Sequence, residues 1–341
     1  MSKHSTPFRP KNVQYANFEM FGATQNKRLP AITSAQKIQD SSIRDLFRQL
    51  SKKTTARIDA FKQLKLKIPQ IQDKEEFLTV AEPCYAVFES SVSDYTIETR
   101  TQAIEMISII LNIVVTKYKD QLSKVAKDVF PTLLLLFFDT EKTVLEKAKE
   151  LLFEHFPTKE KRNAMMSKLR DDISDRIRNL FNELEGAKWD QLDESQSNEN
   201  WGRLASMGLS LATNLLITCR LSHDVYSAFN PPPILAWLQT KKNLFSTRTS
   251  PQMRAAAYVY ISVIVQAGFL QLHGANEVSS FIRAESSPLA QEKLIRLIIA
   301  LLEKDKVKPK EIQQPILESL FLFYQPQKVG LINVLERIKD K

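Results

Sequence analysis

The chain has 341 residues, of which 43% are hydrophobic and 26% are charged, and its formal net charge is +9. These proportions are typical of a folded globular protein and exclude an intrinsically disordered one. Only 7 residues are glycine, so the chain has few places for the phosphate-binding loops, tight hairpins and nucleophile elbows that need positive φ angles. Most other residues are helix formers, which predicts an all-helical protein without catalytic machinery.

The positive charge is concentrated at the N-terminal end. Residues 1–70 hold 14 Lys and Arg against 4 Asp and Glu, a net charge of +10, whereas the rest of the chain holds 34 against 35. A local excess of cations attracts polyanions such as RNA. A solvated, lysine-rich helix surface is the alternative interpretation of the same pattern.

Membrane, metal and secretory features are not indicated. The longest apolar stretches, 106–115 and 129–138, span about ten residues each, and a membrane-spanning helix needs about 20. The N-terminus shows no apolar signal region. The 2 cysteines and 4 histidines are scattered, so we expect no disulfide framework, no metal site and no cofactor. A reducing compartment, the cytosol or the nucleus, fits this cysteine content.

The first helical pattern begins near residue 41. Residues 1–40 are polar, contain three prolines and show no sustained period, so we predict an extended N-terminal arm. Two apolar stripes at the spacing of one helix face then follow on either side of a polar corner. They are formed by Ile43, Leu46, Phe47 and Leu50, and by Ile58, Phe61, Leu64 and Ile68. Two short amphipathic helices joined in this way predict an αα-hairpin.

Similar helix starts recur along the chain. Polar starts at Asp94 and Asp139 lie 45 residues apart, and those at Pro251 and Pro288 lie 37 residues apart. HEAT and armadillo repeats have periods of about 40–47 residues. Because one such helix pair cannot bury its own apolar faces, neighbouring pairs stack into a superhelix. The sequence therefore predicts an all-α fold, an α-solenoid of HEAT/armadillo-like helical repeats.

One polar stretch divides the predicted array. Residues 185–200 are acidic and polar, with few apolar positions, and we predict a surface loop there. This places N-terminal HEAT-like repeats at residues 41–184 and C-terminal HEAT-like repeats at residues 201–341. The run Asn230-Pro231-Pro232-Pro233 cannot continue a helix and predicts a turn in the second half.

Residues with reactive side chains are better explained by structure than by chemistry. Asp171, Asp172 and Asp175 alternate with an apolar stripe and are expected on an exposed helix face. Cys84 and Cys219 lie in apolar segments without a nearby histidine, so we expect small buried thiols rather than nucleophiles. Nucleotide-binding, zinc-protease and serine-hydrolase motifs are missing from the sequence. The chain by itself is therefore not expected to be an enzyme, although an unfamiliar active site remains a further hypothesis.

The densest basic cluster suggests a binding surface. Arg44, Arg48 and Lys52 are spaced by four residues, which places three cations along one helix face, and Lys53 and Arg57 follow directly. Like charges at this spacing repel one another, so a partner anion would stabilise them. The partner is either a phosphate-rich molecule or an acidic protein surface, and plain solvation of the cluster is the remaining alternative.

Two segments carry a resemblance to a known family. The first is FGATQNKRLPAI at residues 21–32, followed by IRDLFRQLSKKTTARIDAFKQL at residues 43–64; the second is NLFSTRTSPQMRAAAY at residues 243–258. The Phe-Gly and Pro-Ala-Ile elements, the Leu-x-Lys-Lys element and a later Pro-x-aliphatic-Arg element occur in the order typical of Listerin proteins. The chain thus resembles, over most of residues 18–270, the N-terminal module of this family of large HEAT-repeat RING ubiquitin ligases, which act in ribosome-associated quality control.

The resemblance implies a docking role. In that family the N-terminal module binds the stalled large ribosomal subunit and a NEMF-like quality-control factor, so rRNA phosphate, a ribosomal protein and that factor are the implied partners, without a membrane or a small-molecule substrate. The implied contact residues are Arg44, Arg48, Lys52, Lys53 and Arg57, and Phe21 and Gly22 would form a docking or self-capping element.

The chain departs from the family pattern at specific points. Thr54 stands where the family usually has an Asp, and residues 94–98 replace an Arg-rich start. A RING needs eight Cys and His ligands, and 2 cysteines and 4 histidines cannot supply them. The resemblance therefore assigns ubiquitin transfer to a RING that this chain does not hold. A generic α-solenoid adaptor, unrelated to ribosomes, is the alternative.

Overall fold

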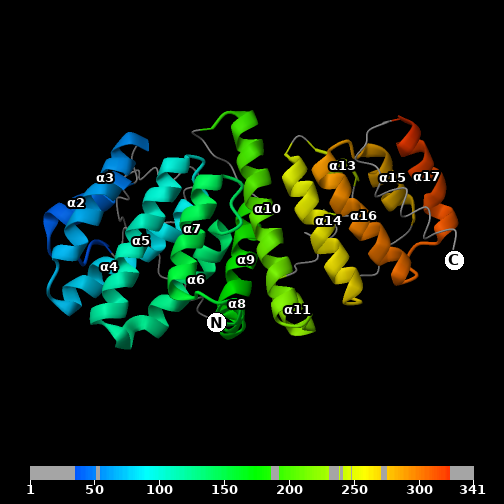
Figure 1. Cartoon of the computed structure of the whole chain (residues 1–341). Helices are drawn as coiled ribbons and strands as arrows, with labels where there is room; N and C mark the ends of the chain where they lie inside the picture. The colour runs from blue at the N-terminus through cyan, green and yellow to red at the C-terminus, as the bar shows by residue number, and fades with distance from the viewer. Residues whose placement is uncertain are drawn as a thin grey trace, which may run out of the picture.

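The predicted all-α class and solenoid architecture are confirmed. The computed structural model describes residues 35–50, 54–185, 192–229, 238, 241–246, 248–269 and 275–322. Across these ranges every regular element is a helix. Figure 1 shows the helices stacked side by side along one axis, from α2 at one end to α17 at the other.

The N-terminal half forms two layers of helices. It consists of α2 (Ser41–Leu50), α3 (Thr54–Lys67), α4 (Lys74–Ser91), α5 (Ile97–Lys117), α6 (Leu122–Leu136), α7 (Lys142–His155), α8 (Lys159–Lys168) and α9 (Arg170–Glu185), with 3-10 turns at Ile68–Gln70 and Lys119–Gln121. Helices α3, α5 and α7 pack in succession in one layer, and α4, α6 and α9 pack in the other. Contacts between α4 and α5 and between α6 and α7 join the two layers, as expected for stacked helical hairpins.

The first hairpin shows why the apolar stripes form helices. Ile43, Phe47 and Leu50 of α2 are buried, and they face Phe61 and Leu64 of α3, which are completely buried. Each of these large side chains contributes about 1.5–3 kcal/mol by leaving water. The predicted αα-hairpin is therefore present. The predicted arm reaches less far than expected, because Ala35 and Ile38 are also buried in this core, while residues 1–34 lie outside the described part of the chain.

The C-terminal half continues the stack. It consists of α10 (Glu194–Thr218), α11 (His223–Phe229), α13 (Lys241–Leu244), α14 (Pro251–Gln266), α15 (Ala275–Ala284), α16 (Pro288–Glu303) and α17 (Pro309–Leu322). Helices α14 and α16 pack together, as do α15 and α17. The starts predicted at Pro251 and Pro288 are confirmed, and the hydroxyl oxygen of Ser250 caps α14 by accepting the N–H of Met253 at 3.2 Å.

Helix α10 joins the two halves. It packs against α6, α8 and α9 on one side and against α14 on the other. In Figure 1 it runs from the top of the stack towards its bottom. Two glycines in α10 allow the neighbouring segments to approach its backbone closely. A Cβ atom at Gly202 would lie 2.7 Å from the carbonyl oxygen of Arg248, and one at Gly208 would lie 3.0 Å from the Phe181 ring.

The start of α10 corrects the predicted loop at residues 185–200. The helix begins at Glu194, where Asp193 and Gln196 form a capping box: the Asp193 carboxylate accepts the N–H of Gln196 at 2.8 Å, and the Gln196 side chain accepts the N–H of Asp193. Reciprocal capping of this kind stabilises a helix start. Residues 194–200 are therefore helical rather than looped, and residues 186–191 lie outside the described ranges.

The acids near the start of α9 lie on an outer face of the stack. Ile173, Ile177 and Leu180 of α9 are buried while Asp171 and Asp175 are exposed, so these acids lie on the predicted outer face. Among the described residues, no helix combines the length and the apolar character needed to cross a membrane.

Candidate docking surface and the buried arginine network

The structure covers three of the seven predicted contact residues. Phe21, Gly22, Lys52 and Lys53 lie outside the described residues. Arg44 and Arg48 lie on α2 and Arg57 lies on α3. Of the predicted helix face Arg44, Arg48 and Lys52, the described residues therefore contain the first two, and both lie on one helix.

Arg44 and Arg48 are both held by groups of the chain itself. Arg44 is half-buried, and its Nη1 donates to the carbonyl oxygen of Ile38 at 3.2 Å. Arg48 is exposed, and its Nη1 lies 2.6 Å from Oδ1 of Asp45. The Asp45 carboxylate offsets the repulsion expected between the two arginines. Because exposed ion pairs are weak, Arg48 can still exchange this partner for an anion of another molecule.

Arg57 is not a surface residue, which corrects the predicted contact set. Its side chain is only 3% exposed, and it forms an ion pair with Asp94, which lies before α5. Its Nε also donates to the carbonyl oxygen of Leu50 at 3.2 Å. A guanidinium with these buried partners cannot contact a ribosomal phosphate without leaving the core. Its role in this fold is to tie α3 to the next repeat.

The Arg57–Asp94 pair belongs to a repeated arrangement. Arg57 follows the first residue of α3 by three positions, and Asp94 precedes the first residue of α5 by three positions. Arg100 and Asp139 occupy the same positions relative to α5 and α7, and Arg254 and Glu285 occupy them relative to α14 and α16. In each case the arginine and the acid form an ion pair: Arg57–Asp94, Arg100–Asp139 and Arg254–Glu285.

Each acid in this arrangement also starts the following helix. Oδ1 of Asp94 accepts the N–H of Thr96 at 2.8 Å, and Oδ1 of Asp139 accepts the N–H of Glu141 at 2.9 Å. Oε1 of Glu285 accepts the N–H of Ser287 at 3.0 Å. Helix starts leave unpaired N–H groups that need such acceptors. One carboxylate thus stabilises a helix start and binds the arginine of the preceding repeat.

The arginines connect consecutive repeats through buried charge. Arg100 is 1% exposed; its Nε lies 3.0 Å from Oδ2 of Asp139. Its Nη1 donates to the carbonyl oxygens of Asp94 at 2.6 Å and Tyr95 at 2.9 Å. In the C-terminal half, Nε of Arg254 lies 2.8 Å from Oε2 of Glu285, to which the Tyr258 hydroxyl donates at 3.1 Å.

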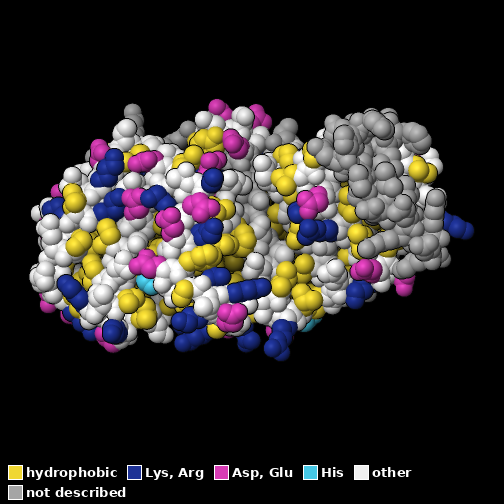
Figure 2. Space-filling model, viewed as in Figure 1, with side chains coloured by type: hydrophobic (Ala, Val, Ile, Leu, Met, Phe, Trp, Pro, Cys, Tyr) yellow, Lys and Arg dark blue, Asp and Glu magenta, His cyan; other side chains and the backbone are white. Residues whose placement is uncertain are grey.

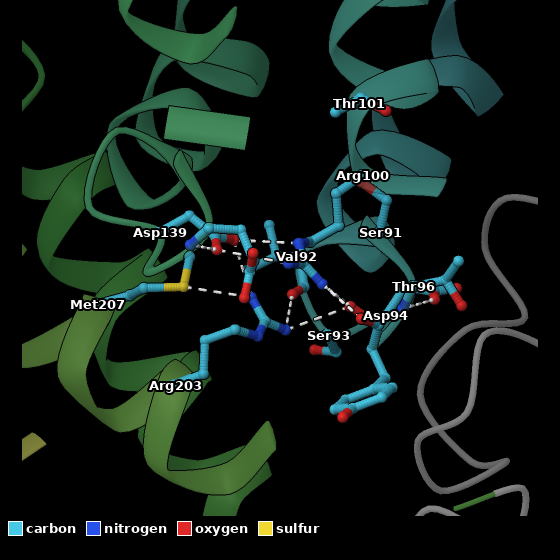
Figure 3. A network of polar contacts seen from close by, with 12 residues as sticks. Ser91, Val92, Ser93, Asp94, Thr96, Arg100, Thr101, Asp139, Arg203 and Met207 are labelled. Atoms are coloured by element: carbon cyan, nitrogen blue, oxygen red, sulfur yellow. Dashed lines mark hydrogen bonds and ion pairs between the residues drawn. The ribbon is translucent and has the colours of Figure 1, made fainter. Parts of the chain in front are cut away.

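Arg203 of α10 inserts into the same network from the other half of the molecule. Its Nη1 lies 2.9 Å from Oδ2 of Asp139, and its Nη2 donates to the carbonyl oxygens of Val92 at 2.8 Å and Asp94 at 3.2 Å. Figure 3 shows Arg203 and Arg100 reaching this cluster from different helices. Asn200 supports Arg203 through its Oδ1 and donates to the carbonyl oxygen of Ser93 at 3.0 Å. Helix α10 is thereby fixed to the first half.

Burial has an electrostatic cost at Arg203. It lowers the pKa of this guanidinium to about 10, while the nearby Asp139 carboxylate opposes that shift. Arg203 therefore remains charged at neutral pH. Three buried arginines, Arg57, Arg100 and Arg203, share the carboxylates of Asp94 and Asp139. Backbone carbonyl oxygens accept further N–H groups of all three. This is a structural network, because each of its arginines is paired with a buried carboxylate of the chain.

The two cysteines lack the features of nucleophiles. Cys84 is completely buried, and burial raises the pKa of its thiol far above the usual value. Cys219, at the end of α10, is half-buried, and burial also raises the pKa of its thiol. A reactive cysteine needs a lowered pKa. The described residues also contain no group of His, Cys, Asp and Glu that could hold a metal ion.

A second cationic surface, on α8, was missed by the sequence analysis. Its sequence KEKRNAMMSK has three lysines and one arginine against one glutamate. Lys159, Lys161 and Lys168 are exposed, and none forms an ion pair with another described residue. Dark blue side chains gather along the lower edge of the molecule in Figure 2, over the region where α8 lies in Figure 1. The local run of lysines was the signal, but the larger N-terminal excess obscured it.

Comparison with known proteins identifies the family. The family model for the N-terminal domain of the E3 ubiquitin-protein ligase listerin matches residues 38–330. A comparison with curated proteins gives no match. The matched range contains α2 to α17, and with them the arginine network and the α8 surface.

Proposed function

Because the chain belongs to the family of listerin N-terminal domains, we propose that it is a docking module of a RING-type E3 ubiquitin ligase in ribosome-associated quality control. It binds the stalled large ribosomal subunit and a NEMF-like quality-control factor in the cytosol. The family match over residues 38–330 carries this proposal. The match includes every helix from α2 to α17, which supports assigning the docking role to the whole array.

The architecture suits docking better than catalysis. The buried arginines join successive repeats and fix α10 between the two halves, so the array can present widely separated surfaces in a defined arrangement. Solenoids use such extended surfaces to bind large partners. The 2 cysteines and 4 histidines of the sequence are too few for the ligands of a RING. We therefore assign binding to this array and ubiquitin transfer to a RING outside these 341 residues.

Ribosomal RNA and ribosomal proteins both offer charged groups to this module. On the helical array, Arg44 and Arg48 remain candidate contacts together with Lys52 and Lys53, and Phe21-Gly22 remains a candidate docking element. Arg57 is removed from this set because it is buried beside Asp94. The exposed position of Arg48 supports a contact in which an anion replaces Asp45.

Sedimentation with purified ribosomal subunits tests the proposal. The whole chain is mixed with large or small subunits, with and without the NEMF-like factor, and centrifuged through a sucrose cushion. We expect it to sediment with large subunits at about 50 mM salt, less so at about 200 mM salt, because phosphate contacts weaken as salt rises. The factor should increase the bound fraction.

The alternative predicts a different outcome of the same experiment. An α-solenoid adaptor unrelated to ribosomes would stay in the supernatant with either subunit at both salt concentrations. Equal sedimentation with large and small subunits would also contradict the proposal, because it would indicate unspecific attraction between a basic protein and RNA.

A further inference from the structure

The α8 surface consists of exposed cations that form no ion pair with another described residue. We define it by Lys159, Lys161 and Lys168 of α8 and by Arg220, which follows α10. All four are exposed, and no ion pair joins any of them to another described residue. In contrast, Arg44, Arg48 and Arg57 of the N-terminal cluster each bind an acceptor within the chain. The α8 cations are thus available to a partner without breaking an existing ion pair, unlike Arg48 and Arg57 of the N-terminal cluster.

Packing holds α8 with its polar side outward. Met165 and Met166 of α8 and the adjoining Leu169 are buried beneath it. The opposite side carries Asn163, Ala164 and Ser167, which are exposed. These small uncharged residues lie between the lysines, so a partner can approach the helix closely while the long lysine side chains reach it from both flanks.

Arg162 fixes the corner from which α8 begins. Its guanidinium carbon lies 4.1 Å from the centre of the Phe153 ring of α7. Its Nη1 donates to the carbonyl oxygens of Phe156 and Pro157, both at 2.9 Å. Stacking and these hydrogen bonds place one cation of α8 in a structural role. The helix is therefore preformed, and a ligand does not have to order it.

The surface extends from α8 to the end of α10. Helix α8 packs against α10, and Cys219 follows the last residue of α10. Arg220 follows with a φ of 55°, and its side chain is exposed. The neighbouring Arg170 is not included, because its Nε lies 3.5 Å from Oδ1 of Asp171. The one acid within α8 is Glu160, in the first turn.

The chemistry of this surface favours nucleic acid over protein. A specific protein interface has an apolar, often aromatic centre, but both large apolar side chains of α8, Met165 and Met166, are buried. A lysine ammonium group acts as a point charge, which suits contacts to backbone phosphates because these contacts do not depend on the base sequence. We propose that the α8 surface binds the phosphate backbone of RNA. This inference rests on the proposed function, since the large ribosomal subunit is the source of that RNA.

The direct test uses RNA alone. The triple variant Lys159→Gln, Lys161→Gln, Lys168→Gln of the full chain is titrated against a fluorescent A-form RNA duplex at several salt concentrations. The logarithm of the binding constant falls as the logarithm of the salt concentration rises, and each lost phosphate contact makes this slope less steep by about 1. We therefore expect the slope of the variant to be less steep by about 3 than that of the unmodified chain. Its affinity for the duplex at low salt should be at least about tenfold lower.

A matched control comes from the other end of the molecule. Lys304, Lys306 and Lys310 are also exposed, so the variant Lys304→Gln, Lys306→Gln, Lys310→Gln removes the same charge from the α16–α17 region. It should retain the slope of the unmodified chain. Equal losses in both triple variants would overturn the inference, because RNA would then respond only to net charge. Failure of the unmodified chain to bind the duplex would overturn it as well.

Two further measurements, of poly-glutamate binding and of sedimentation with large subunits, distinguish a wrong ligand from a wrong docking function. If poly-glutamate binds as tightly as the duplex and loses affinity equally in the α8 variant, the surface recognises acidic protein and the RNA assignment is wrong. If the unmodified chain and the α8 variant sediment equally with large subunits, the docking function stands and the α8 surface is not its site. If the unmodified chain binds the duplex through α8 but not the subunits, the inference stands and the proposed function fails.

Discussion

The two cation-rich regions of this molecule differ in what their charges contact. In the α2–α3 region, Arg48 pairs with Asp45, and Arg57 is buried against Asp94. On α8, Lys161 and Lys168 are exposed without an ion pair among the described residues. The region with the larger excess of positive charge in the sequence thus uses part of that charge internally, while a shorter run of lysines leaves its charge for a partner.

The difference shows that a count of charges does not measure the charge available for binding. A buried guanidinium is held by carboxylates whose removal leaves an uncompensated charge, so it contributes to stability. An exposed ammonium contributes little to stability and can neutralise phosphate. The comparison therefore predicts that substitutions in the two groups affect different measurements: unfolding for the buried arginines and RNA binding for the α8 lysines.

The largest effect is expected at Asp139, the acid shared by two arginines. Asp139→Ala leaves Arg100 and Arg203 buried without that carboxylate, and breaking a buried pair costs about 3–5 kcal/mol. We expect the free energy of unfolding in urea to fall by at least that amount. Asp45→Ala, which removes the exposed partner of Arg48, is the matched control. A loss below about 1 kcal/mol at Asp139 would contradict the role of the network.

A slightly smaller effect is expected at Arg57, and it tests the corrected assignment. Arg57→Met leaves the buried Asp94 carboxylate unpaired, but Asp94 keeps its hydrogen bond from the N–H of Thr96 at 2.8 Å. The loss in unfolding free energy should therefore be about 3 kcal/mol, at the low end for a broken buried pair. Lys62→Met on the exposed side of α3 is the control. Equal stability of the two variants would show that Arg57 is a surface residue after all.

Arg48 should have only a small effect on stability. Its ion pair with Asp45 involves side chains that are 57% and 55% exposed, and such pairs contribute about 0.2–1 kcal/mol. Arg48→Ala should lower the unfolding free energy by less than about 1 kcal/mol. A reduction of large-subunit binding by the same variant would support Arg48 as a contact, whereas a large loss of stability would place it with the buried arginines.

The smallest effect on stability is expected for the α8 lysines. Because Lys159, Lys161 and Lys168 are exposed and unpaired among the described residues, the triple glutamine variant should keep the urea midpoint of the unmodified chain. Its thermal and chemical unfolding curves should overlay those of the control triple variant at residues 304, 306 and 310. A clear drop in the midpoint would show that these lysines stabilise the fold, and it would weaken the contrast between the two regions.

Local patterns were sufficient to predict several of the helices. The stripe Ile43, Phe47, Leu50 is buried as its spacing requires, and the polar starts at Asp94 and Asp139 do precede α5 and α7. Such signals depend on residues within one or two helical turns, and these are adjacent in the sequence. The fold class followed because stacked amphipathic helices leave few other arrangements.

The roles of the arginines could not be predicted in the same way. Arg57 and Asp94 are 37 residues apart, and Arg203 and Asp139 are 64 apart. Whether a charged side chain is buried depends on a distant partner, so periodicity within one helix does not decide it. The signal that remains in the sequence is the register: an acid three positions before one helix and an arginine three positions into the helix of the preceding repeat.

The start of α10 was predictable in principle. Asp193 and Gln196 have the spacing of a capping box, but the high polarity of residues 185–200 favoured a loop. The polar residues after the cap have a specific use, because Asn200 and Arg203 carry the polar side of α10 into the buried network. A polar helix that inserts between two repeats resembles a loop in composition, and only its partners distinguish the two.

Hydrogen–deuterium exchange of the chain bound to large ribosomal subunits tests most directly which cations dock. Amide exchange is compared between the free and bound states for peptides from α8 (Lys159–Lys168) and from α2 (Ser41–Leu50). The α8 surface predicts slower exchange in α8 on binding, at low salt, with the effect lost as salt rises. Unchanged exchange in α8, with protection confined to α2, would contradict it.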